Sequence, residues 1–282
     1  MKELSIRRRI IYDKIFKAII ILLTFCSILP MFFILLFITS KGISVINWRF
    51  LSQLPKPVGE IGGGISNAII GTFVLIAIAT AFSVPLGIFV GIFLSENRKG
   101  KLASLTRLCV ETLQGVPSIV IGIIAYIWLV LSMGSFSALS GGLALGLMML
   151  PVIITATEET LKLIPGSLKE ASLALGVSYP RTILKVILPA GVSGIVTGIL
   201  LSIARVAGET APLLFTAFGS PFMNLDVLKP INSLPLMIFN YATSPYPEWQ
   251  TLAWGASFVL IALVLGLNLF TKIVTKRWKV QF

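Results

Sequence analysis

The sequence has no histidine and only two cysteines, Cys26 and Cys109. Both cysteines lie in or beside apolar stretches, and neither has the spacing of a metal ligand. Zinc sites are built mainly from cysteine and histidine side chains, so this composition argues against a zinc centre. We expect the chain to bind neither a metal nor another cofactor, and nothing in the sequence calls for a disulfide.

Charged residues are also scarce, at 12% of the chain against about 25% in a soluble domain. Hydrophobic residues make up 56% of the 282 residues. A chain this long and this apolar would expose too much apolar surface in water, so its natural solvent is a lipid bilayer. The sequence therefore predicts an all-α integral membrane protein.

The net charge of +12 does not indicate nucleic-acid binding. The basic residues lie in short loops between apolar runs, where membrane orientation signals are found. Near the N-terminus, Arg7-Arg8-Arg9 precedes an apolar run at residues 18–39. That run is longer than the core of a secretory signal peptide and is interpreted as a permanent first span.

Six spans are predicted, at about 18–39, 66–94, 117–133, 138–160, 189–215 and 252–273. An interfacial helix over 101–116 is expected to lead into the short third span. Most Lys and Arg residues fall in 2–17, 98–107, 162–185 and 272–279, whereas Lys41, Arg49, Lys56 and Lys229 fall on the other side. Cytoplasmic loops carry the excess of basic residues, so both termini are predicted to be cytoplasmic.

The two long external loops differ in character. Residues 40–65 contain two prolines and three consecutive glycines and are expected to be irregular. Residues 219–250 are apolar and proline-rich, and are expected to pack as short helices on the outer surface, either covering the bundle or docking a partner. Glycine pairs spaced four apart are interpreted as helix-packing sites: Gly87/Gly91, Gly142/Gly146 and Gly194/Gly198.

The segment between the fourth and fifth spans reads as a short amphipathic helix. Ser167-Leu168-Lys169-Glu170 fits a capping box, and Gly176 suits the left-handed position that ends a helix. Helical spacing predicts one shared face for Leu168, Ala171, Ser172 and Leu175. A second short helix is expected from Tyr179-Pro180, and Pro189 is expected to begin the next span.

This segment resembles the EAA loop of ABC importer permeases. Glu170, Ala171, Gly176 and Leu188-Pro189 match that loop, whereas Ser172 replaces its second alanine and Val186 takes the usual isoleucine position. The resemblance implies that a helix within residues 167–188 docks in a groove of an ATP-hydrolysing subunit. The alternative is an ordinary amphipathic helix lying on lipid headgroups.

No G-x-x-x-x-G-K-[ST] loop occurs in the chain; Gly100-Lys101 lacks the upstream glycine and is followed by Leu102. Such a loop is the usual cradle for ATP phosphates. This absence fits the resemblance to the EAA loop, which implies a transport subunit that is not itself an enzyme, with ATP and Mg²⁺ used by a partner.

Within the fifth span, Arg205 and Glu209 are four residues apart and are predicted to form an ion pair on one helix face. A charge at such depth usually faces a bundle interior or an aqueous cavity. Arginine offers several N–H donors to an oxyanion, and Gly208 and Pro212 weaken the helix nearby. The alternative is a purely structural salt bridge.

The stretch from Arg205 through Gly208-Glu209-Thr210-Ala211-Pro212 to Leu214 resembles the signature of phosphate importer permeases of the PstA type. Gln114-Gly115-Val116-Pro117-Ser118 is similar to that family's stretch entering the third span. The resemblance implies that Arg205 and Glu209 lie on a phosphate translocation route, and we include Thr210 as a further candidate on it.

The remaining polar residues of the spans are interpreted as structural. Asn67, Gln114 and Asn268 are expected to make helix-packing hydrogen bonds. Glu158 and Glu159 are expected to be solvated at a cytoplasmic span end, and Glu111 to lie near Arg107 at the interface.

Taken with the resemblance, these features predict a six-helix type I ABC importer permease. Residues 1–65 hold the tail, first span and external loop, and 66–282 the permease core, with its coupling loop at about 161–188. The chain is expected in a prokaryotic plasma (inner) membrane, working by alternating access. Expected partners are membrane lipid, a PstC-like second permease, a PstB-like ATPase dimer and a PstS-like external phosphate-binding protein.

Three alternatives stay open. The first is a permease for another oxyanion, such as sulfate or molybdate, because a buried arginine suits those anions too. The second is an ion-coupled secondary carrier, which would need no ATPase. The third is a membrane scaffold that senses phosphate through its partner and transports nothing.

Overall fold

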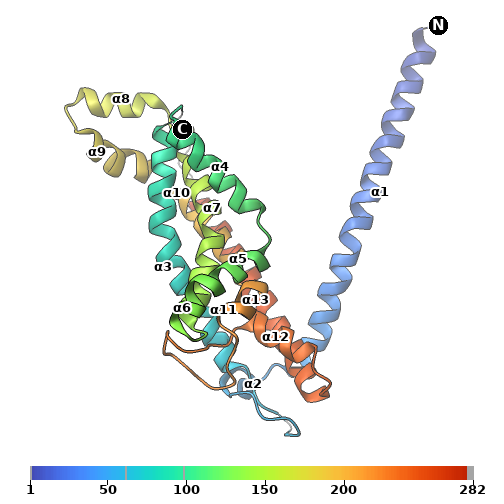
Figure 1. The fold of residues 1–282 in the computed structure, drawn as a ribbon. Helices are drawn as coiled ribbons and strands as arrows, with labels where there is room; N and C mark the ends of the chain where they lie inside the picture. The colour runs from blue at the N-terminus through green and yellow to red at the C-terminus, as the bar shows by residue number, and fades with distance from the viewer. Residues whose placement is uncertain (1, 61, 98, 278–282) are drawn as a thin grey trace.

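The computed structural model describes residues 2–60, 62–97 and 99–277, and these form helices joined by loops, of which the one over 217–233 is long (Figure 1). Arg98 and Lys279, two members of the predicted cytoplasmic set, lie outside the described residues. The longer elements are α1 (Lys2–Gly42), α3 (Ser66–Glu96), α4 (Lys101–Gly115), α7 (Ala138–Leu163), α10 (Leu188–Val206) and α13 (Pro247–Arg277). The shorter ones are η1 (Ile43–Val45), α2 (Trp48–Ser52), α5 (Ser118–Ala125), η2 (Tyr126–Val130), α6 (Leu131–Met133), α8 (Gly166–Ala174), α9 (Tyr179–Thr182), η3 (Ile183–Ile187), α11 (Ala211–Thr216) and α12 (Leu234–Ala242).

The spanning helices agree with the expected number. Among the described residues, five stretches are long and apolar enough to cross a membrane, at 8–45, 66–96, 138–163, 179–206 and 247–273. A sixth span is formed only if α4 is joined to the helix from Ser118 to Met133, and these two are bent by 106°. The bend falls at Val116-Pro117, because proline disfavours a helical conformation in the residue before it. The helix expected over 101–116 is α4, and its place at the membrane interface stays a prediction.

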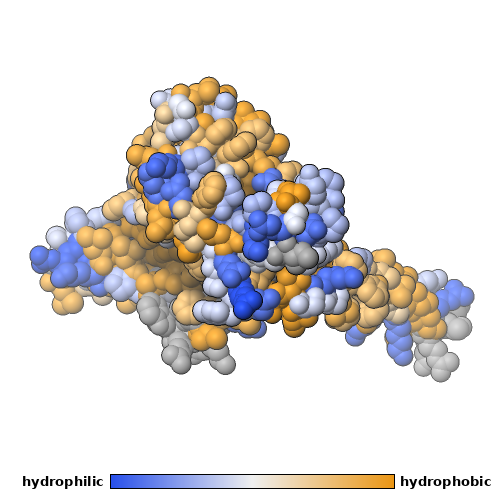
Figure 2. Space-filling view, turned by 90° about the horizontal axis from the view of Figure 1, so that it is seen from below, coloured by the Kyte–Doolittle hydropathy of each residue, from blue (hydrophilic) through white to orange (hydrophobic). Residues whose placement is uncertain are grey.

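Helix α1 stands apart from the bundle along most of its length (Figure 1). It meets α13 only near its C-terminal end, where the Phe37 ring packs edge-on against Trp254 at 5.3 Å. Nearby, a Cβ on Gly42 would lie 2.5 Å from the Phe258 Cβ, so the two helices touch closely there. Many large apolar side chains are exposed, and hydrophobic residues cover much of the face seen in Figure 2, as expected of a chain whose solvent is lipid.

Glycines bring α3, α7 and α10 into close contact, which confirms the predicted role of the glycine pairs. Each of the six lies where an added Cβ would come within 3.0 Å of a side chain on the neighbouring helix. The pairs of facing residues are Gly87–Ile153, Gly91–Thr157, Gly142–Ile78, Gly146–Phe82, Gly194–Thr160 and Gly198–Ala156. Helix α7 is therefore the central element, with α3 and α10 packed against it.

Substituting alanine for Gly91 is expected to destabilise the bundle. The new Cβ would lie 2.5 Å from the Thr157 Cβ and 3.0 Å from the Ile154 carbonyl oxygen. Overpacking of this kind typically costs about 1–3 kcal/mol. Thermal unfolding of the purified chain in detergent should show a lower midpoint for Gly91→Ala. The matched control is Gly266→Ala, since no atom lies within 4 Å of that added Cβ; equal midpoints for the two variants would contradict this packing.

A second apolar cluster closes the lower end of the bundle in Figure 1. It joins Phe50 of α2, Ile65 before α3, Leu234 and Met237 of α12, and Leu252 of α13. Helix α12 begins where the Ser233 hydroxyl accepts a hydrogen bond from the Leu236 amide at 3.4 Å. The 219–250 segment thus contains a short packed helix, as its composition predicted.

Candidate functional site

Helix α8 is the short helix predicted between the fourth and fifth spans. It ends as expected: Gly176 has φ +78°, and its amide donates to the Leu173 carbonyl at 2.9 Å. The predicted capping box is wrong, because α8 begins at Gly166 with Pro165 as its N-cap and no side-chain cap. Ser167 therefore lies inside the first turn of α8 and not at the N-cap position, so its side chain cannot act as the cap.

The exposed face of α8 differs from the one predicted. Ser172 is buried, and its hydroxyl lies 3.0 Å from the Thr182 hydroxyl of α9, which ties α8 to α9. Leu175 follows the helix and is 84% exposed, so the predicted face shared with Ser172 is wrong. Glu170 and Ala171 are exposed as well. Together with Leu175 they form an exposed surface of mixed polar and apolar character that packs on no other described helix.

Lys169 lies on the opposite side of α8 and contacts the end of α3. Its ammonium pairs with the Glu96 carboxylate, and donates to the Tyr179 hydroxyl at 3.1 Å. Burial lowers the pKa of Lys169, but hydrogen bonds and the nearby Glu96 charge outweigh it, so the pKa is raised. A raised lysine pKa means that this contact is fully present below the ordinary lysine value and is lost only as pH rises past the raised one.

The next span is one continuous helix from Tyr179 to Val206. The helix start predicted at Tyr179-Pro180 is confirmed, and α10 begins at Leu188, beside Pro189. The two helices are parts of one span, however, so this span begins earlier than the predicted residue 189. Pro180 and Pro189 each lie in the first turn of α9 and α10, where proline is tolerated, and the π-helical turn η3 joins the two. The apolar face of this helix is held against α7 by contacts among Leu161, Ile183, Ile187 and Ile195.

The predicted span 189–215 is broken just after Arg205. Helix α10 ends at Val206, and α11 begins only at Ala211. In the gap, the Gly208 amide donates to the Arg205 carbonyl at 3.3 Å. Helix α11 is fixed by α5, because a Cβ on Gly122 would lie 2.7 Å from the Pro212 Cα.

This break overturns the expected ion pair. Arg205 and Glu209 no longer share a helix face, and the ion pairs of the described residues do not include one between them. Arg205 is exposed, whereas Glu209 and Thr210 are half-buried. The Arg205 charge lies in the last turn of α10, where the helix dipole favours a cation. Its guanidinium makes no hydrogen bond within the described part of the chain, so its donors are available to a ligand.

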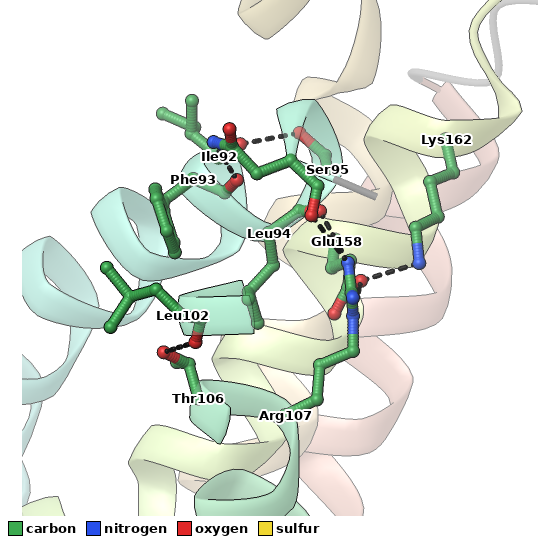
Figure 3. Close-up of polar contacts among 10 residues, drawn as sticks. Ile92, Phe93, Leu94, Ser95, Leu102, Thr106, Arg107, Glu158 and Lys162 are labelled. Atoms are coloured by element: carbon green, nitrogen blue, oxygen red, sulfur yellow. Dashed lines mark hydrogen bonds and ion pairs between the residues drawn. The ribbon is translucent and has the colours of Figure 1, made fainter. Parts of the chain in front are cut away.

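Sequence reasoning missed a polar cluster where α3, α4 and α7 meet (Figure 3). Arg107 Nε donates to Glu158 Oε1 at 2.7 Å, and Lys162 Nζ donates to the same oxygen at 2.5 Å. Arg107 Nη2 also donates to the Leu94 carbonyl at 2.8 Å. The Glu158 side chain is only 9% exposed, so the expectation that it is solvated is wrong. The available signal was the spacing of Glu158 and Lys162, four apart with the glutamate first.

Replacing Glu158 with glutamine is expected to loosen this junction. The change leaves two cations facing each other in a sheltered position, and breaking a buried pair by removing one partner typically costs about 3–5 kcal/mol. Because this site is partly open, we expect roughly half of that. The thermal midpoint in detergent measures it. Glu159→Gln is the matched control, and an equal shift from both variants would contradict the role of the pair.

Of the three polar residues predicted to make helix-packing hydrogen bonds, Gln114 bonds another helix, whereas Asn67 bonds the loop after α11 and Asn268 lies at the surface. Asn67 donates to the Ser220 carbonyl at 2.8 Å, and Gln114 donates to Thr155 Oγ1 at 3.2 Å. Asn268 is exposed. Arg107 was expected to lie near Glu111, but its ion pair in the structure is with Glu158. Cys26 and Cys109 are free thiols, and within the described ranges no group of three or more metal-ligating side chains could hold an ion.

Comparison with known families gives a match over most of this fold. Residues 83–280 match the binding-protein-dependent transport system inner membrane component family. The chain belongs to this family. The match covers the C-terminal part of α3 and α4 to α13, and so includes both α8 and the break beside Arg205.

Individual relatives agree with the family. The chain is 44% identical over 241 residues to the phosphate transport system permease protein PstA of Yersinia pestis, covering 85% of this chain and 82% of the relative. It is 38% identical over 260 residues to the probable phosphate transport system permease protein PstA of Methanocaldococcus jannaschii, covering 92% of each. Among solved structures, the inward-facing MetNI methionine ABC transporter matches with a TM-score of 0.65 at 20% identity, covering 77% of this chain and 96% of that one.

The structural match shows the fold alone: an all-helical type I ABC importer permease. The family and the apolar helices together make the chain a multi-pass membrane transport component.

Proposed function

We propose that this chain is a permease subunit of an ATP-driven importer of inorganic phosphate. Two relatives, 44% and 38% identical over most of the chain, are named as phosphate transport system permease proteins. The observation that carries the proposal is Arg205 at the break between α10 and α11, an exposed guanidinium whose donors have no partner among the described residues. A planar guanidinium binds phosphate oxygens with two parallel N–H donors, and its charge stays fixed at all physiological pH values.

The translocation route is proposed to run past Arg205, with Glu209 and Thr210 on the same broken segment. Glu209 accepts a hydrogen bond from a protonated phosphate oxygen, which helps to separate phosphate from fully ionised anions. Because Arg205 is not neutralised by Glu209, its full charge acts on the anion. The chain makes or breaks no covalent bond in this scheme.

Coupling to ATP hydrolysis is proposed to occur through α8. Ser167, Glu170, Ala171, Ser172 and Gly176 shape this helix, and its exposed face docks on an ATPase subunit that binds ATP and Mg²⁺. Motion of α8 then reaches Arg205 along the continuous helix from Tyr179 to Val206. The full assembly contains a second, PstC-like permease, two PstB-like ATPase subunits and a PstS-like external binding protein. Residues 66–282 form the permease core, and both termini face the cytoplasm of a prokaryotic cell.

Labelled phosphate uptake at low external concentration tests this proposal. Cells lacking only this chain should regain uptake when the native chain is restored, and only while ATP is available. Uptake that is indifferent to the chain would overturn the phosphate assignment. Competition by excess sulfate or molybdate in the same cells separates a phosphate permease from one for another oxyanion, and uptake that persists without ATP would instead indicate an ion-coupled carrier.

A further inference from the structure

Two helices, α8 and α9, each bring a side chain to one carboxylate at the end of α3. Glu96 is the last residue of α3, and its Oε2 receives both the Lys169 ammonium from α8 and the Tyr179 hydroxyl from α9. The Lys169 Nζ also lies 4.6 Å from the centre of the Tyr179 ring, which adds a cation–π contact. The side chains of Lys169 and Glu96 are 30% and 19% exposed, so the contact is partly sheltered from water.

The same end of α3 is also held by α4. Arg107 of α4 donates to the Leu94 carbonyl at 2.8 Å and to the Asn97 carbonyl at 3.4 Å, and also pairs with Glu158 of α7. A cation at the last carbonyls of a helix satisfies groups that have no partner within the helix. The end of α3 is therefore fixed to α4 and α7, and any element attached to Glu96 is attached to that three-helix unit.

The chain connection alone leaves α8 less firmly placed. Between α8 and α9 the backbone passes through Gly176, and between α9 and α10 it passes through the π-helical turn Ile183–Ile187. Wide π turns are places where a helix bends. The helix from Tyr179 to Val206 is continuous, but part of a pull on α8 along this path alone would be absorbed by bending at Gly176 and at the π-helical turn.

We propose that Glu96, Lys169 and Tyr179 form a second coupling junction, which transmits movement of α8 directly to the packed pair α3 and α7. The proposal rests on the proposed docking of an ATPase subunit on α8. In this scheme the three are positioning residues, since none of them touches phosphate or ATP. Two attachments, one through α10 and one through α3, make α8 move as a rigid lever and make α3, α7 and α10 move together.

The proposal is specific because an ordinary ion pair would not have this effect. A single exposed ion pair contributes little to stability, so its loss would leave both assembly and coupling unchanged. Here a third group shares the same oxygen, and the three side chains come from three separate helices. Removing one of them frees α8 to tilt without unfolding any helix.

The test uses the complete transporter in liposomes, with phosphate uptake and ATP hydrolysis measured on the same vesicles. Glu96→Gln and Lys169→Met are each expected to assemble normally but to transport at least about fivefold less phosphate per ATP hydrolysed, as for a coupling interaction of ordinary size. Lys101→Met is the matched control, because Lys101 is an exposed lysine at the start of α4, and it should keep the native ratio. An unchanged ratio in both junction variants would overturn the proposal.

A rescue separates positioning from a general structural effect. The double variant Glu96→Lys with Lys169→Glu reverses both charges and should recover most of the lost ratio. In a second pair, Glu96→Cys with Lys169→Cys in a chain whose Cys26 and Cys109 are replaced by serine, a short bis-thiol cross-linker should restore coupling. Failure of both rescues would overturn the rigid junction.

A docking variant makes the two proposals distinguishable. Glu170→Arg on the exposed face of α8 should lose co-purification of the ATPase subunits if that face docks them. If the ATPase subunits still bind and uptake continues, the proposed docking fails. If Glu170→Arg loses the ATPase while both junction variants keep the native transport ratio, docking stands and the second junction is wrong.

Discussion

Replacing Arg205 with glutamine should reduce phosphate uptake by roughly ten- to a hundredfold while the transporter still assembles. A hydrogen bond to a charged group contributes about 1.5–3 kcal/mol, and a glutamine side chain at this position offers neither the same paired donors nor any charge. The Arg205 side chain is exposed and makes no described hydrogen bond in the chain, so its loss leaves no buried group unsatisfied. The effect is therefore expected on transport and not on stability.

Two further variants show which property of Arg205 matters. Arg205→Lys keeps the charge but loses the planar fork, and uptake should fall to an intermediate level. Arg49→Gln is the matched control, since Arg49 is also exposed but lies on α2, away from the break between α10 and α11. Initial uptake rates at several phosphate concentrations, with membrane levels of every subunit checked, measure these effects. Native uptake by Arg205→Gln would remove Arg205 from the route.

The class of fold was predictable from sequence because its causes are local. Apolar runs long enough to cross a bilayer, and small residues spaced four apart, each act through a single helix and its period. The same applies to the end of α8, where Gly176 adopts the left-handed conformation that glycine favours. The end of α4 before Pro117 has an equally local cause, because proline restricts the residue before it.

The break after Arg205 was not predicted, although both of its causes were noted. Gly208 and Pro212 weaken a helix, but many membrane helices tolerate such residues when neighbours satisfy the backbone. Here α5 packs against Pro212 through Gly122, and Val206 and Leu213 join the main core, so tertiary packing fixes α11 as a separate piece. The contact between Gly122 and Pro212 joins residues far apart in the chain, and periodicity within one segment carries no information about it.

The charged clusters at the ends of α3 and α7 were missed for the same reason. Arg107 and Glu158 are 51 residues apart, and Glu96 and Tyr179 are 83 apart. The positive-inside rule uses Lys and Arg residues only as signals of membrane orientation, so it gives no information about which carboxylate each of them pairs with. Of these pairs, only Glu158 and Lys162, four residues apart on one helix, could be predicted from the sequence.

Gly176→Val is expected to lower phosphate uptake by about tenfold, because it would disturb the proposed docking of the ATPase on α8. Gly176 has φ +78°, and a left-handed conformation costs a residue with a Cβ roughly 1–2 kcal/mol, more for a β-branched one. The chain can relieve this strain only by changing the turn, which breaks the bond from the Gly176 amide to the Leu173 carbonyl. Helix α8 would then point away from its place beside α9.

Asparagine and a second glycine provide the comparison. Gly176→Asn should keep most of the uptake, because asparagine tolerates the left-handed region. Gly166→Ala on the same helix should be neutral, since no atom lies within 4 Å of the added Cβ and its φ is not positive. Because no atom lies within 4 Å of a Cβ at position 176 either, the difference between these variants reports backbone conformation and not crowding. Equal uptake from Gly176→Val and Gly176→Asn would show that the left-handed turn does not control where α8 docks.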